Sequence, residues 1–312
     1  CVQRLRVVVS RYRVMSVDVV VVFLNRLPPR STLFPYTTLF RSPKPGLVDR
    51  FGPGSHRDMD FVTFLLSASA LAPFWQKQAL EGLRGVPPEE ALNVLRRTGI
   101  EMDRAMFEAT SGVNTHKGLI FALSLLLYGA GRCSFLSEGL RPEKVAAAAA
   151  AAVSGCCEKE LGSLESEPPA RPLTSGARIY LEHGMTGIRG EAERGFPTVL
   201  EHGIPPFRRA LARGVTRHDS ALYALFSLMK HGEDTNIVAR KGYPFWKADY
   251  LPLVENLLAH EIPYDTGALG SISEMDEFFS LHRISPGGAA DLLTCTLFLH
   301  DCDTLFPDVV NI

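Results

Sequence analysis

Four glycine-rich segments carry most of the residues whose types and spacing suit chemistry. They are residues 43–60, 112–118, 187–197 (with the similar segment 232–242) and 285–293. Each combines glycine with charged or amide side chains, and each lies between apolar helical runs. Glycine lets a ligand approach the backbone, and the free N–H groups at a helix start attract anions. Together the segments predict a buried polar site for a multiply phosphorylated ligand.

The second segment, GVNTHKG, has the features of a helix start that holds an anion. Asn114 or Thr115 is a suitable N-cap, which places His116 and Lys117 in the first turn. A helix N-terminus beside a lysine suits a phosphate, and a histidine can take part in acid–base chemistry. An ordinary capped helix with an exposed His–Lys pair is the alternative interpretation.

The first segment combines rigidity with charge. Its stretch PKPGLVDR has two prolines and presents Lys44, Asp49 and Arg50. The following SHRDMD places His56, Asp58 and Asp60 within five residues, a set that can bind a divalent metal or act in acid–base chemistry. A helix N-terminus capped by Ser55 or Asp58 explains the same residues.

The third segment contains two acids that are candidates for a catalytic base, Glu191 and Glu193. On a helix these side chains would diverge, whereas in an extended or turn segment they would share a face. In the similar segment 232–242, Asp234 and Asn236 are candidate ligands of a hard cation, and Arg240 suits a polyphosphate.

The fourth segment places Gly287 and Gly288 before a predicted helix, with Asp291 in its first turn. This arrangement lets a ligand approach the backbone. The chain lacks GxxxxGK[ST], a strand–GxGxxG–helix unit, GxSxG and HExxH. The sequence therefore argues against a P-loop kinase, a Rossmann dehydrogenase, an α/β-hydrolase and a zincin.

The elements that must position these segments are helices. Apolar residues recur at helical spacing in residues 61–80, 119–128, 143–161, 220–230, 250–260, 273–282 and 289–300. We expect Pro73 to kink or break the first of these helices. Alternating strand patterns are nearly absent. The pattern predicts one compact all-α domain over residues 43–312, in which glycine-rich loops at helix N-termini form a central polar site.

Composition narrows the class of protein further. We find no stretch that approaches the roughly 20 apolar residues of a membrane-spanning helix, so no membrane partner is expected. The net charge of −1 over 312 residues argues against a nucleic-acid partner. The six cysteines show no zinc-like spacing and the sequence shows no export signal, so we expect free thiols in the cytoplasm.

The first 42 residues differ from the rest of the chain. They carry a net charge of +6, which leaves −7 for residues 43–312. Residues 32–42 read TLFPYTTLFRS, which is the translation of a common short-read sequencing adapter. Eleven matching positions are too many for coincidence, so we interpret residues 1–42 as a non-native, poorly structured segment.

Six motifs in this order closely resemble the triphosphoribosyl-dephospho-CoA synthase family. They are PKPGLVDR, GSHRDMD, GVNTHKG-x-IF, G-x-RGE-x-x-x-GFP, DTN-x-x-x-R and SPGG-x-ADLL, and they run from about residue 43 to about residue 300. Two departures are visible: Lys241 stands where the family usually has Gly, and Ala289 where it usually has Ser. Neither departure removes a charged catalytic candidate.

The resemblance implies a pentosyl transfer. ATP and 3′-dephospho-CoA give 2′-(5″-triphosphoribosyl)-3′-dephospho-CoA and adenine, with Mg²⁺ as an inferred cofactor. The product is the prosthetic-group precursor for the acyl carrier subunit of citrate lyase or malonate decarboxylase, and a separate transferase would load it. In the family's reaction the β-linked ribose of ATP becomes α-linked in the product, which implies net inversion at C1. By analogy with inverting glycosidases, such a displacement calls for a base at the attacking hydroxyl.

The resemblance also places candidate roles on residues of this chain. The catalytic candidates are Glu191, Glu193, His116 and Asp234, with Glu191 or Glu193 favoured as the base. The candidate substrate and phosphate ligands are Lys44, Arg50, His56, Arg57, Asn114, Thr115, Lys117, Arg189, Asn236, Arg240, Gly287 and Gly288. The metal candidates are Asp49, Asp58, Asp234 and Asp291.

Two other functions fit the same segments. A helical, metal-dependent hydrolase of a nucleotide N-glycosidic bond would use water as the acceptor and would release adenine from ATP alone. A non-enzymatic helical sensor would bind ATP or CoA without turnover, even when Mg²⁺ is supplied.

Sequencing of the intact source locus tests the interpretation of residues 1–42. We expect a different N-terminal coding sequence, joined near Pro43. Recovery of the same 42 codons from genomic DNA would show that the segment is native.

Overall fold

The computed structural model describes residues 44–166, 173–259 and 266–305. Within these ranges the chain is helical and contains no strand; an isolated bridge joins Asp49 and Gly52. The prediction of an all-α fold is therefore confirmed. The interpretation of residues 1–42 as a non-native segment lies outside the described residues.

The long helices form most of the structure. They are α2 (Phe61–Leu83), α3 (Pro88–Ala109), α4 (Lys117–Leu136), α5 (Pro142–Ala151), α10 (Arg217–His231), α14 (Thr266–His282) and α15 (Gly287–Leu305). The shorter ones are α6 (Ser163–Ser166), α7 (Ser175–His183), α8 (Gly187–Glu193), α9 (Ile204–Ala212), α11 (Thr235–Lys241), α12 (Tyr243–Phe245) and α13 (Leu251–Ala259). Three π-helical turns are η1 (Glu158–Gly162), η2 (Val199–Gly203) and η3 (Trp246–Tyr250).

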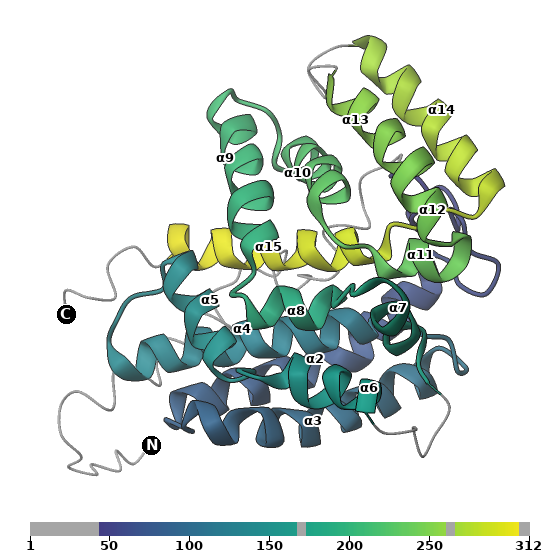
Figure 1. The fold of residues 1–312 in the computed structure, drawn as a ribbon. Helices are drawn as coiled ribbons and strands as arrows, with labels where there is room; N and C mark the ends of the chain where they lie inside the picture. Colours follow the sequence, from purple (N-terminus) through teal and green to yellow (C-terminus); the bar gives the residue numbers. More distant parts are fainter. Residues whose placement is uncertain (1–43, 167–172, 260–265, 306–312) are drawn as a thin grey trace.

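Helices α4 and α15 form the centre of this arrangement. Helix α4 packs against α2, α3, α5, α8 and α15, and α15 also contacts α9, α10 and α11. In Figure 1, α15 crosses the middle of the molecule, with α2–α5 on one side and α9, α10, α13 and α14 on the other. The glycine-rich segments that precede these two helices are thereby brought to the interior.

Helix α4 is apolar around most of its circumference because it lies in the core. Its 20 residues are long and apolar enough to cross a membrane, so the expectation that no stretch approaches this limit is wrong. Most of the helix is buried inside the protein, including Leu123, Leu126 and Tyr128. The helix is accordingly the core helix of a folded helical body.

The helix boundaries differ from the sequence expectation at several points. Pro73 lies inside α2 without ending it, and α2 is capped by Asp60 in a capping box with Thr63 rather than by Ser55 or Asp58. The helix expected over residues 143–161 stops at Ala151, and Gly155 then adopts a φ of 72°. Only a narrow stripe of α3 is buried, which explains why its helical pattern was missed.

Glycines allow the core helices to touch backbone to backbone. A Cβ added to Gly131 of α4 would lie 2.2 Å from the carbonyl oxygen of Ala79 in α2. One added to Gly82 of α2 would lie 2.1 Å from the carbonyl oxygen of Tyr128 in α4. Neither helix can accept a methyl group here without moving its partner.

The variant Gly131→Ala tests this close packing. We expect it to lower the free energy of unfolding by about 1–3 kcal/mol, because the added methyl group forces α2 and α4 apart. The matched control is Gly99→Ala in α3, where an added Cβ meets nothing within 4 Å. That control should raise stability by about 0.5–1 kcal/mol through helix propensity. Urea unfolding measures both changes, and equal effects would contradict the close approach.

Candidate active site

A cavity of about 340 Å³ lies where four helices begin. Its lining includes the first residues of α4, α8, α11 and α15: Lys117, Gly187, Thr235 and Gly287. Helix N-termini carry partial positive charge and free N–H groups, so their convergence favours an anionic ligand. The glycine-rich segments supply each of these helix starts.

The cavity brings together many of the residues selected from the sequence. Those that line it are Lys44, His56, Asn114, Thr115, His116, Lys117, Glu191, Asn236, Arg240, Gly287, Gly288 and Asp291. Those outside its lining are Asp49, Arg50, Arg57, Asp58, Arg189, Glu193 and Asp234. Residues almost 250 positions apart in the chain therefore face one space.

Asp234 holds the N-termini of two helices together instead of facing the cavity. Its Oδ1 accepts the N–H groups of Asn236 and Ile237 at 3.0 and 3.3 Å. Its Oδ2 accepts the N–H group of Ala289 at 3.2 Å. Burial raises the pKa of Asp234 to about 6, and these N–H donors oppose the shift. With both oxygens committed to backbone, Asp234 fits a positioning role better than a catalytic or metal-binding one.

Glu191 is a buried acid whose carboxylate borders the cavity. Its side chain accepts hydrogen bonds from the N–H and Oγ1–H groups of Thr198, at 2.8 and 2.9 Å. Burial raises its pKa, and the Thr198 bonds partly offset this. A carboxylate with a raised pKa holds a proton more strongly, which improves it as a general base.

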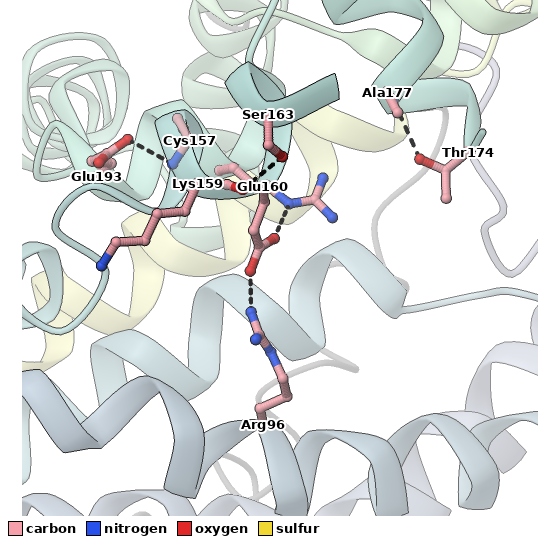
Figure 2. Close-up of polar contacts among 9 residues, drawn as sticks. Arg96, Cys157, Lys159, Glu160, Ser163, Thr174, Ala177 and Glu193 are labelled. Carbon is pink, nitrogen blue, oxygen red and sulfur yellow. Dashed lines mark hydrogen bonds and ion pairs between the residues drawn. The ribbon is translucent and has the colours of Figure 1, made fainter. Parts of the chain in front are cut away.

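Glu193 and Arg189 point away from the cavity because the segment is helical. In α8, Glu193 accepts the N–H group of Cys157 at 3.3 Å. Figure 2 shows this contact beside the ion pair between Glu160 and Arg96. Glu160 also forms an ion pair with the guanidinium of Arg189. The divergence of Glu191 and Glu193 expected for a helix is the arrangement found.

His116 is a neutral, buried ring at the start of α4. Its Nδ1 lies 2.8 Å from Oγ of Ser67, which in turn accepts a hydrogen bond from Thr115 Oγ1 at 2.7 Å. Burial lowers the pKa of His116 to about 4. Asn114, not Thr115, accepts the N–H group of Lys117, at 3.3 Å.

His56 and Arg240 also line the cavity. His56 Nε2 lies 2.8 Å from Oγ of Ser285, and its Nδ1 lies 3.5 Å from the guanidinium of Arg240. Burial, and next the charge of Arg240, lower the pKa of His56 to about 4. The ring is therefore uncharged at neutral pH and serves as a hydrogen-bonding group.

Comparison with known proteins identifies the family. The family model for ATP:dephospho-CoA triphosphoribosyl transferase (CitG) matches residues 39–309. The chain belongs to this family.

Named relatives agree with the family model. A probable 2-(5″-triphosphoribosyl)-3′-dephosphocoenzyme-A synthase of Albidiferax ferrireducens is 38% identical, over 90% of this chain and 91% of the relative. The 2-(5″-triphosphoribosyl)-3′-dephosphocoenzyme-A synthase of Pectobacterium atrosepticum is 39% identical, over 84% of each. A probable 2-(5″-triphosphoribosyl)-3′-dephosphocoenzyme-A synthase of Photobacterium profundum is 37% identical, over 86% of this chain and 85% of the relative. No solved structure matches the chain.

Asp291 is the metal candidate that lines the cavity of this transferase. An added Cβ on Gly118 would lie 2.2 Å from Oδ2 of Asp291, so the carboxylate sits directly over the start of α4. Burial raises its pKa well above the usual value, and the charge of Asp234 adds to this. Mg²⁺ typically takes one or two carboxylates together with substrate phosphates, and Asp291 fits that pattern.

The other metal candidates have different surroundings. Asp49 accepts the N–H group of Phe51 at 2.8 Å in a tight turn, and Asp58 is exposed beside His56. Among the described residues, one group has metal-ligand spacing: Cys156, Cys157 and Glu193. Thiol ligands suit softer metals than Mg²⁺, and this group lies outside the cavity lining.

The sequence selection missed several residues that line the cavity. They are Arg194, Thr198, His231, Glu233 and Ser285. Arg194 and Ser285 stand inside the quoted motifs, but nothing in their spacing distinguished them from their neighbours. Glu233 accepts the N–H groups of Thr186 and Gly187 at 3.1 and 3.0 Å, which links the start of α8 to the segment before α11.

NMR titration of the histidine rings tests the electrostatics of the cavity. We expect His56 and His116 to titrate near pH 4, with the variants His56→Gln and His116→Gln assigning the signals. In the unfolded chain a histidine takes up its proton near pH 6.5, so these two rings should make stability fall as the pH drops from 6.5 towards 4. Either signal titrating near pH 6.5 would contradict the described burial.

Proposed function

We propose that the cavity is where this family's reaction takes place: transfer of the 5-triphosphoribosyl group of ATP to the 2′-hydroxyl of 3′-dephospho-CoA, with release of adenine. The observation that carries the proposal is family membership over nearly the whole of residues 43–312, combined with four helix starts that meet at one cavity. The product would be consumed by a transferase that loads the acyl carrier subunit of citrate lyase or malonate decarboxylase.

The cavity offers positive charge where the triphosphate must be held without being cleaved. Lys44 is buried, and burial lowers its pKa to about 8, so it remains protonated at pH 7. Lys117, Arg194 and Arg240 add charge from three other segments. The starts of α4 and α15 contribute N–H groups. If Mg²⁺ binds with the substrate, Asp291 is its protein ligand, and the ion neutralises phosphate charge.

Glu191 is the proposed general base. It accepts the proton of the 2′-hydroxyl while that oxygen bonds to C1 of the ATP ribose. The bond from C1 to adenine breaks in the same displacement, and adenine leaves with the electron pair and takes up a proton. Thr198 holds the Glu191 carboxylate in one orientation, so the base needs little rearrangement at the moment of reaction.

The reaction itself is tested by incubating the chain with ATP, Mg²⁺ and dephospho-CoA. We expect equimolar adenine and triphosphoribosyl-dephospho-CoA, detected by mass spectrometry. Adenine released from ATP at the same rate without dephospho-CoA would instead indicate a hydrolase. Binding of both nucleotides without any turnover would indicate a sensor.

The variant Glu191→Gln tests the base. We expect adenine release to fall by at least about 10²-fold, the usual contribution of a general base. Glu193→Gln is a matched control on the same helix, since that carboxylate faces Cys157 and should leave turnover near normal. Near-normal turnover of Glu191→Gln, with its fold confirmed by circular dichroism, would rule out this assignment.

A further inference from the structure

A second hollow, of about 700 Å³, opens beside the cavity and is strongly basic. Residues 55–58, the end of α11 and the end of α14 form its walls. Its charged lining consists of Arg57, Arg240, Lys241 and Arg283, with Asp58 as the acid. Four basic side chains and one acid give this concave surface a net charge of +3, which attracts a diphosphate or a similar anion.

The two hollows meet at His56 and Arg240, which line both of them. These two side chains therefore form the boundary between the outer hollow and the cavity. His56 Nε2 lies 2.8 Å from Oγ of Ser285, which stands two residues before Gly287, the first residue of α15. The helix starts proposed to hold the triphosphate line the cavity on the other side of this boundary.

The shapes of the two hollows suit different substrates. The cavity lies deep among helix starts, which suits the reacting ribose of ATP because water there would hydrolyse the donor. The outer hollow faces solvent, which suits a long ligand whose remote arm takes no part in the reaction. Dephospho-CoA is such a ligand: its diphosphate separates the ribose that carries the attacking hydroxyl from the pantetheine arm.

We propose, on the basis of the proposed function, that the outer hollow binds the diphosphate of dephospho-CoA and directs its ribose past His56 and Arg240 into the cavity. Arg283 is a specificity-determining residue of this subsite. It stands just after α14 with a φ of 55°, a conformation that favours glycine or asparagine. Its side chain is exposed, so packing gives no reason for arginine at this position.

The test uses the full chain with Arg283→Gln and, separately, Arg57→Gln. We expect the KM for dephospho-CoA to rise about tenfold while kcat at saturation stays within about twofold, the pattern of lost uniform binding. The KM for ATP should also stay within about twofold. Arg283→Lys should recover part of the affinity, since it restores the charge without the planar guanidinium. The matched control is Arg209→Gln, an exposed arginine of α9 that lines neither hollow.

Isothermal titration of each nucleotide separates this inference from the proposed function. Weaker dephospho-CoA binding in both variants, with unchanged ATP binding, supports the subsite even if the unaltered chain releases no adenine. In that case the proposed function alone fails. Unchanged dephospho-CoA binding, or an equal loss for ATP and dephospho-CoA, would overturn the subsite whether or not the chain turns over.

Discussion

The arrangement of the site depends on one buried carboxylate, that of Asp234. It accepts backbone N–H groups from α11 and from α15, so the starts of two helices some 50 residues apart are joined at a single side chain. Glycine at position 288 favours this contact, because an added Cβ there would lie 3.1 Å from the Asp234 carboxyl carbon and would crowd it. Asn236 and Arg240 on α11, and Asp291 on α15, reach the cavity only because their helices begin side by side.

The same arrangement, a carboxylate that accepts N–H groups at a helix start, recurs at α8. Glu233 accepts the N–H groups at the start of α8, and Glu191 near its end accepts those of Thr198 and Val199 in the next helix. A buried carboxylate is costly unless several donors satisfy it, and free N–H groups at a helix start provide them. Of the acids that look catalytic in the sequence, Asp234 and Glu193 bond backbone N–H groups and lie outside the cavity lining. Glu191 also accepts N–H groups, but it is buried and lines the cavity, and Asp291 is half-buried and lines the cavity.

Sequence patterns were sufficient for the fold class and for the glycine-rich segments that supply most of the cavity lining. Apolar runs separated by proline and glycine identify helices, and glycine next to charge marks the places where helices begin near a ligand. The direction in which each acidic side chain points depends on local structure that the sequence pattern does not determine. Glu191 and Glu193 separate because α8 is helical, and Asp234 is a cap because α15 begins beside it. Such contacts join distant segments, so no local spacing reveals them.

Positive side chains line both hollows although the domain as a whole is acidic. Residues 43–312 carry a net charge of −7, which opposes the approach of polyanionic nucleotides. Beyond a Debye length of about 8 Å that opposition is screened, so the groups within contact distance decide binding. The ammonium group of Lys44 is buried, so at a given distance it attracts a phosphate more strongly than an exposed lysine does, although Asp49 and Asp276 lie nearby. With most nearby acids already bonded to backbone N–H groups, these few cations, the helix starts and any bound metal ion would balance the phosphates of both nucleotides in the proposed function.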